Sequence, residues 1–271
     1  MTSAAATSPN TRPSTSCGNK TAAAASINSS FIPATYRQHR SALLINHGAD
    51  FRFGVLSGRV IEDAGEAVER EYWARLYGRW EALDPAGVAA VLEGFGRPWW
   101  VVGGWAIDAF TGVPREHQDV DVSILACDVP ALREHVRGRW DLWNFAGGDM
   151  RPLTDQHPDV FHPASQIWVR EHGDAPWVID LPLTPDRDGL WTNKFLPEHT
   201  AEIDEVTWIA DNRIRYLNPE IFLFFKARKQ LTKDTYDLTQ TWPTLTTPQQ
   251  TWLHQTLHKT NPHHPWLPHL T

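Results

Sequence analysis

The chain has 271 residues, of which 41% are hydrophobic and 11% aromatic, so most of it can bury a core and be globular. The formal net charge of −7 argues against the strongly basic surface that general nucleic-acid binders present. The sequence has no apolar run of the roughly 20 residues that a membrane-spanning helix needs, and no apolar core of a signal peptide. Its two cysteines, Cys17 and Cys127, do not suggest a disulfide framework. These features predict a cytoplasmic protein.

Residues 1–50 differ in composition from the rest of the chain: they are rich in Ser, Thr, Ala and Asn, and Asp50 is their only acidic residue. Such a segment buries too little apolar surface to offset the entropy of ordering, so we predict a disordered extension. The alternative is an upstream extension from a misplaced start, with translation beginning at Val55 or Val60. Without residues 1–50 the chain loses one acid and four bases, and the remaining 31 acids and 21 bases give a net charge of −10.

The remaining sequence predicts alternating helices and short strands. A helix is expected over 61–83, where apolar residues recur at helical spacing. Polar N-cap residues, some with proline in the first turn, begin three later helices, at Asp84, Asp128 and Asn218. Strands are predicted at 99–102, 119–125, 140–145, 166–170, 177–183, 206–210 and 213–217, and helices at 84–94, 105–111, 128–139, 218–231 and 249–259.

Two carboxylates, Asp119 and Asp121, occur one residue apart in the predicted strand 119–125. Residues i and i+2 of a strand point to the same face, so we expect the two side chains to lie side by side. Adjacent anions repel one another unless a cation lies between them. Hard oxygen ligands of this kind suit Mg²⁺, which also binds substrate phosphates, so the pair predicts a metal site.

A Gly-Gly pair, Gly103 and Gly104, separates the strand 99–102 from the next predicted helix. Glycines at this position leave backbone N–H groups accessible at a helix N-terminus, which favours phosphate binding. A Gly-Gly pair alone is usually only a turn. Beside a carboxylate pair, it indicates phosphoryl or nucleotidyl transfer.

A third carboxylate, Asp180, interrupts the apolar run 177–183. A buried Asp needs a partner, and that partner is either an arginine or a shared metal ion. If this strand lies next to 119–125, Asp180 can ligate the metal and accept the proton of an attacking hydroxyl group.

These motifs resemble two antibiotic-modifying families, the aminoglycoside 2''-adenylyltransferase-like and the lincosamide nucleotidyltransferase families, within the DNA polymerase β-like nucleotidyltransferase superfamily. The resemblance covers about 88–238 and is specific around 103–121, where this chain has Gly103, Gly104, Trp105, Arg115, His117, Asp119 and Asp121. It implies an α/β fold with a small mixed sheet, flanking helices and C-terminal helices. It also implies a donor of ATP or another NTP with Mg²⁺. Many superfamily members have serine after the glycine, where this chain has Trp105.

Several basic residues are further candidates. Arg115 and His117 either bind phosphate or brace the loop before the strand. Lys226 and Lys233 lie in a segment, 217–237, that resembles the family's later helix. Each either reaches the triphosphate or belongs to an ordinary solvated helix face.

We divide the chain into an extension at 1–50, a nucleotidyltransferase domain at 51–217 and a C-terminal helical segment with a Pro/His-rich tail at 218–271.

The expected reaction is transfer of a nucleoside monophosphate, AMP from ATP, to a hydroxyl of a small acceptor. The acidic charge favours a cationic acceptor such as an aminoglycoside, with a lincosamide as the other antibiotic class. The alternatives are a toxin-like enzyme that modifies protein or tRNA, and a non-catalytic nucleotide-binding module. The oligomeric state is not predicted. Three aromatic residues are candidates to line the acceptor site: Trp143, Trp168 and Trp191.

Overall fold

A computed structural model describes residues 71–72, 74–229 and 232–270. The N-terminal extension, its alternative start and the first part of the helix predicted over 61–83, residues 61–70, lie outside these residues. Residues 71–72 and 74–77 of that helix are helical, but the helix does not extend to 83 as predicted: Gly78 follows with a φ of +98°, and Trp80 pairs with Trp177 in an isolated bridge. Cys17 lies outside the described residues, and Cys127 is a free cysteine.

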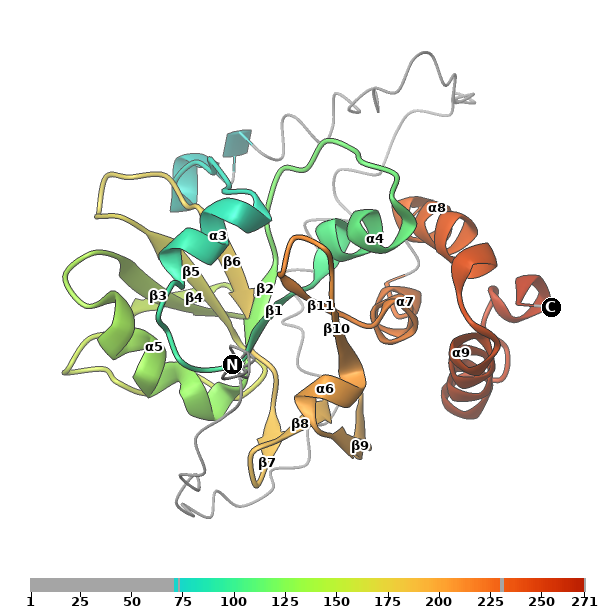
Figure 1. The fold of residues 1–271 in the computed structure, drawn as a ribbon. Helices are drawn as coiled ribbons and strands as arrows, with labels where there is room; N and C mark the ends of the chain where they lie inside the picture. The colour runs from blue at the N-terminus through green and yellow to red at the C-terminus, as the bar shows by residue number, and fades with distance from the viewer. Residues whose placement is uncertain (1–70, 73, 230–231, 271) are drawn as a thin grey trace, which may run out of the picture.

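The strands of the described residues form three small sheets; in Figure 1, β1 and β2 lie near the middle, the sheet of β3 to β6 lies on the left, and β7 to β9 lie at the lower end. The first has the order β10-β11-β1-β2, the second β4-β3-β5-β6 and the third β7-β8-β9. Pairing is antiparallel throughout except between β1 and β11, which are parallel. The strands are β1 (Trp99–Val101), β2 (Val122–Ile124), β3 (Asp141–Ala146), β4 (Asp149–Pro152), β5 (Gln166–Arg170), β6 (Ile179–Pro182), β7 (Asp186–Arg187), β8 (Leu190–Asn193), β9 (Leu196–Ala201), β10 (Thr207–Ile209) and β11 (Arg215–Leu217).

The first two sheets meet where β2 runs parallel to β6. Isolated bridges join Asp121 to Asp180 and Leu125 to Thr184. The backbone N–H of Asp180 donates to the Val120 carbonyl at 3.1 Å, and that of Thr184 donates to the Ile124 carbonyl at 3.0 Å. The junction therefore brings together two aspartates that are 59 residues apart in the sequence.

The helices form two groups (Figure 1). Helices α3 and α5 pack against the joined sheets in the largest apolar cluster, with Val88, Leu132 and Ile167 among its fully buried members. Helices α7, α8 and α9 gather with α4 on the other side, around Leu223 and Leu253. The helices are α3 (Pro85–Val91), α4 (Gly103–Thr111), α5 (Val129–Val136), α6 (Ile203–Val206), α7 (Pro219–Ala227), α8 (Thr232–Thr241) and α9 (Thr247–Thr260), with short 3₁₀ turns at Ala126–Asp128, Trp242–Thr244 and Leu267–His269.

The predicted α/β class is confirmed, since small mixed sheets are flanked by helices and helices follow at the C-terminus. The Asp84 cap is also confirmed, because its carboxylate accepts from the Gly87 N–H at 2.7 Å. Asp128 and Asn218 occupy the N-cap positions as predicted, each with a proline in the first turn of its helix, but neither side chain makes a capping hydrogen bond. Asp128 also lies in a 3₁₀ turn and is 3.7 Å from the Arg97 guanidinium.

Two element boundaries near the motifs differ from the prediction. The strand predicted over 119–125 contains only Val122–Ile124, with Asp121 in a single bridge before it. The helix predicted from Trp105 begins at Gly103, so both glycines are helical. No helix within the described residues is long and apolar enough to cross a membrane.

The Pro/His-rich C-terminal segment packs against the preceding helices instead of forming only a polar tail. The His264 ring is 4% exposed and hydrogen-bonded to the Ala227 carbonyl at 2.8 Å, at the end of α7. Trp266 and Leu270 are buried in the same helical cluster.

Candidate active site

Asp121 and Asp180 form the centre of the candidate site. Asp121 immediately precedes β2, and its carbonyl accepts from the Val102 N–H at 2.9 Å, beside the start of α4. Asp180 lies within β6, where it is the bridge partner of Asp121. The structure thus brings together two of the three predicted carboxylates.

Asp119 lies in the loop before β2 and is exposed. The prediction that a strand places Asp119 and Asp121 on one face is wrong, because residue 119 is not in a strand. Its charge still reaches the other two carboxylates, since Asp119 raises the pKa of both. Within the described part of the chain, no group of three or more His, Cys, Asp or Glu side chains is gathered tightly enough to hold a metal ion.

The site carries concentrated negative charge. Burial, and next the charge of Asp119, raise the pKa of Asp121 to about 6. Burial, and next the charges of Asp121 and Asp119, raise the pKa of Asp180 well above its ordinary value. Perturbed carboxyls of this kind are typical of functional sites, since repulsion between them is relieved when a cation binds.

One carboxylate oxygen of Asp180 is held and the other is not. Gln166, on the neighbouring strand β5, donates its side-chain N–H to Asp180 Oδ2 at 2.9 Å. Asp180 Oδ1 is buried and has no hydrogen-bond partner among the described residues. A buried carboxylate oxygen without a partner fits the coordination of a cation.

Gly103 lies against the Asp121 carboxylate at the first turn of α4. Its φ is +77°, and a Cβ atom at this position would overlap Asp121 Oδ2. Only glycine satisfies both restrictions. The N-terminus of the nine-residue helix α4 is thereby held beside the carboxylates.

The Gly-Trp pair and His117 form a second close contact. A Cβ atom on Gly104 would lie 2.7 Å from Cε1 of His117. The His117 ring stacks on Trp105 with centroids 4.2 Å apart, and its Nε2 is 2.8 Å from an Asp108 oxygen. The Trp105 indole N–H donates to the Asp119 carbonyl at 3.1 Å. These contacts support the bracing alternative for His117, because the ring holds the loop that carries Asp119.

Arg115 and Lys226 share a network of carboxylates. The Arg115 guanidinium is 3.0 Å from Asp108 and 2.5 Å from Asp237. The Lys226 ammonium is 2.8 Å from Asp237 and 2.9 Å from Asp234. The network joins α4, α7 and α8, so these contacts favour a bracing role for both cations. Phosphate binding by either one stays a prediction.

Replacing Arg115 with Met is expected to lower the free energy of unfolding by about 2 kcal/mol, because it removes a partner from Asp237, whose side chain is only 1% exposed. The matched control is Arg137→Met, whose ion pairs with Glu134 and Asp155 lie at the surface, where solvent screens them, so this variant should lose much less stability. Chemical denaturation measures both. Equal losses would contradict the bracing role, and weaker nucleotide binding by a stable Arg115→Met variant would support phosphate binding instead.

Other residues of the site were not predicted. Lys194, between β8 and β9, and Lys229, just after α7, both lower the pKa of Asp121 and Asp180. Gln166 was also missed. No motif marks these residues, and only the pairing of β5 with β6 and the packing of the third sheet bring them to the acids. Lys233 lies in α8, but its side chain is outside the described residues.

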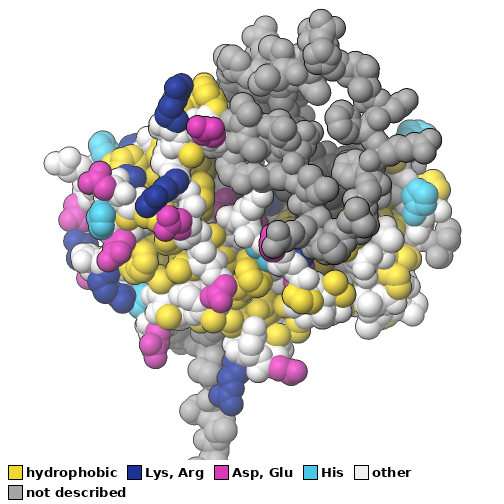
Figure 2. Space-filling model, turned by 90° about the horizontal axis from the view of Figure 1, so that it is seen from above, with side chains coloured by type: hydrophobic (Ala, Val, Ile, Leu, Met, Phe, Trp, Pro, Cys, Tyr) yellow, Lys and Arg dark blue, Asp and Glu magenta, His cyan; other side chains and the backbone are white. Residues whose placement is uncertain are grey.

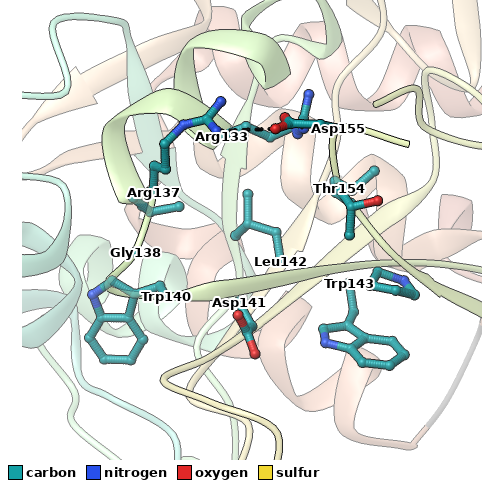
Figure 3. A pocket seen from close by; sticks show the side chains of 12 residues that line it. Arg133, Arg137, Gly138, Trp140, Asp141, Leu142, Trp143, Thr154 and Asp155 are labelled. Carbon is teal, nitrogen blue, oxygen red and sulfur yellow. Dashed lines mark hydrogen bonds and ion pairs between the residues drawn. The ribbon is translucent and has the colours of Figure 1, made fainter. Parts of the chain in front are cut away.

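One groove of the surface lies away from the carboxylates. A groove of about 420 Å³ is lined by Arg133, Trp140, Trp143 and Asp155, between α5 and the β3–β4 hairpin (Figure 3). Asp155 pairs with Arg133 at 3.0 Å across it. Of the aromatic candidates, Trp143 lines this groove and Trp191 is buried in the core. Only Trp168 is paired directly with Asp180, across β5 and β6.

One family model matches part of the chain. The family model described as Aminoglycoside-2''-adenylyltransferase matches residues 86–137, which include Gly103, Asp119 and Asp121. The predicted resemblance to this family is confirmed for that segment. No curated protein matches the chain.

Solved structures of antibiotic-modifying enzymes resemble the chain at low identity. The antibiotic-resistance factor ANT(2'')-Ia, in its solution structure, is 16% identical with a TM-score of 0.41, over 65% of this chain and 89% of that one. ANT(2'')-Ia in complex with adenylyl-2''-tobramycin is 17% identical with a TM-score of 0.42, over 64% and 94%. The lincosamide antibiotic adenylyltransferase LnuA, with lincomycin bound, is 19% identical with a TM-score of 0.39, over 57% and 92%.

Proposed function

We propose that the protein is a Mg²⁺-dependent nucleotidyltransferase that moves a nucleoside monophosphate from an NTP, AMP from ATP, to a hydroxyl of a small acceptor. The observation that carries this proposal is the bridge between Asp121 and Asp180 beside the N-terminus of α4. It combines an acidic cation site with a helix end suited to phosphate. The family match over 86–137 supports the same reaction class.

The carboxylates fit a divalent cation. Asp180 Oδ1 lacks a partner, and the pKa of Asp121 is raised because burial and neighbouring charge disfavour its anion. Asp121 and Asp180 would hold Mg²⁺, and Asp119 would join them from its exposed loop. Bound there, Mg²⁺ supplies positive charge that neutralises the triphosphate and the leaving pyrophosphate.

The residues of the chain would then perform the transfer by positioning. Backbone N–H groups of Gly103 and Gly104 bind phosphate oxygens at the start of α4. The acceptor oxygen attacks the α-phosphorus, the bond from that phosphorus to the β-phosphate bridging oxygen breaks, and pyrophosphate leaves. Asp180 takes the hydroxyl proton, and Gln166 keeps its carboxylate oriented through the 2.9 Å hydrogen bond.

The proposed acceptor is a small, cationic, hydroxyl-bearing molecule, with aminoglycosides as the first class and lincosamides as the second. Residues 51–271 contain 31 acidic and 21 basic residues, and their net charge of −10 favours cationic partners. Charged side chains of both signs are interspersed on the part of the molecule that is coloured in Figure 2. We place the acceptor beside Trp168, the cross-strand partner of Asp180.

One assay tests the proposed function. The protein is incubated with Mg²⁺, labelled NTPs and a panel of aminoglycosides, lincosamides, tRNA and protein extract, and the labelled species is identified. Label on a small antibiotic supports the proposal, and replacing Asp180 with Asn should lower the rate by about 1000-fold. Label on tRNA or protein would instead support the toxin-like alternative. Binding of an NTP without any labelled product would support the non-catalytic nucleotide-binding module.

A further inference from the structure

Lys194 lies in the tight connection between β8 and β9, in the third sheet. A register shift falls between Thr192 and Asn193, just before it. Bulges of this kind redirect the following side chain and are frequent beside active sites. Asn193, the preceding residue, is fully buried, and its Oδ1 accepts from the Phe195 N–H at 3.0 Å, which fixes the connection.

Aromatic rings fix the Lys194 ammonium in place. Its nitrogen lies 5.3 Å from the centroids of both Phe195 and Phe225. The two rings meet edge to face, with centroids 5.3 Å apart. Phe225 belongs to α7, so the contact anchors the β8–β9 connection to the helix that precedes Lys229. Such cation–π contacts hold a cation without neutralising its charge.

The charge of Lys194 is directed at the acidic pair. Lys229, Lys194 and then Lys226 lower the pKa of Asp121, whereas Lys194 and Lys229 are the cations that lower the pKa of Asp180. Burial, and next repulsion from Lys229, lower the pKa of Lys194, whereas the two aspartates act in the opposite direction. Among the described residues, no carboxylate lies within 4.0 Å of either lysine ammonium, whereas Lys226 and Arg115 each contact two.

We propose that Lys194 is a donor-binding residue, and that it and Lys229 contact the triphosphate oxygens from the side opposite Asp121 and Asp180. This inference rests on the proposed function. A partly buried Lys194 near an exposed Lys229, neither of them paired with a carboxylate among the described residues, favours an anion between them, and a polyphosphate supplies several negative oxygens. In this arrangement the acids would hold the metal, and the lysines would hold the phosphates. Lys194, which no motif indicated, replaces Lys226 as the leading phosphate contact.

Binding of α,β-methylene ATP and of adenosine, each with Mg²⁺, tests the proposal by calorimetry on the full chain. Lys194→Met keeps the aliphatic stem against Phe195 and Phe225 but removes the charge. It should weaken binding of the ATP analogue by about 30-fold, as expected for loss of a charge-assisted contact, and binding of adenosine by less than about threefold. Lys194→Arg should recover most of the lost affinity. The control Lys259→Met removes an exposed cation that pairs with Glu198, and it should bind both ligands like wild type.

The outcomes separate this inference from the proposed function. If wild type binds the ATP analogue but Lys194→Met binds it equally well, Lys194 does not contact phosphate and the inference is wrong. Equal losses for the analogue and for adenosine would show a structural role and overturn it as well. If wild type binds no nucleotide at all, the proposed function fails, and the inference fails with it.

Discussion

The Asp121→Asn variant is expected to lose nucleotidyl transfer by about 1000-fold while the metal-free protein becomes more stable. The loss follows because an amide is a weaker ligand for Mg²⁺ and carries no charge against the triphosphate. The gain follows because burial and the neighbouring Asp119 disfavour the Asp121 anion, which raises its pKa to about 6. An opposite change in activity and stability distinguishes a functional carboxylate from a structural one.

The stability gain should depend on pH in a defined direction. Because the folded-state pKa of Asp121 is about 6, above its ordinary value of 3.8, the folded protein binds more protons than the unfolded chain between these values. The free energy of unfolding of wild type therefore falls as pH rises through this window. The difference between Asp121→Asn and wild type should be about 2 kcal/mol at pH 8 and should disappear near pH 4.

Urea denaturation in EDTA at pH 4, 6 and 8 measures this difference, and the labelled-nucleotide assay measures the activity. Asp155→Asn is the control, because its pairing with Arg137 lowers the pKa of Asp155 instead of raising it. That variant should gain no stability at pH 8 and should keep full activity. A less stable Asp121→Asn variant at pH 8, or one with wild-type activity, would contradict the assigned role.

The sequence predicted the main elements of the site because its chemistry is local. Gly103, Gly104, Asp119 and Asp121 fall within 19 residues, and the family model matches the same segment. Asp180 was predicted from its position as a single charge in an apolar run. Asp180 could lie close to Asp121 only if its strand lay next to the strand predicted at 119–125. The bridge between Asp121 and Asp180 confirms that the two segments are neighbours.

The missed features all depend on tertiary contacts. The third sheet follows no clear alternation of polar and apolar residues, so β7, β8 and β9 were not predicted, and Lys194 was missed with them. The sequence made Lys226 a candidate phosphate contact. Only the packing of α8 against α7 shows that Asp234 and Asp237 pair with it. His264 falls in the predicted Pro/His-rich tail. Its contact with the end of α7 joins residues 37 apart in the sequence, so no local pattern indicated it.

Gly103→Ala is expected to disrupt both the fold near the site and the reaction. The methyl group would overlap the Asp121 carboxylate, and the φ of +77° adds backbone strain. Strain of this type costs about 1 kcal/mol, and a forced displacement in a packed region adds about 1–3 kcal/mol. Because the displaced group is the carboxylate that we propose to bind the metal, we expect the transfer rate to fall by at least about 100-fold.

Gly112→Ala is the matched control for this variant, at the other end of α4. Its φ is +72°, nearly that of Gly103, but an added Cβ atom there has no described atom within 4 Å. It should lose about 1 kcal/mol of stability and keep its activity, since it carries the backbone strain without the overlap. The difference between the two variants, measured by urea denaturation and by the transfer assay, thus isolates the contact between Gly103 and Asp121. Equal effects on activity would show that the site tolerates movement of Asp121, and the proposed arrangement of helix end, metal and carboxylate would be wrong.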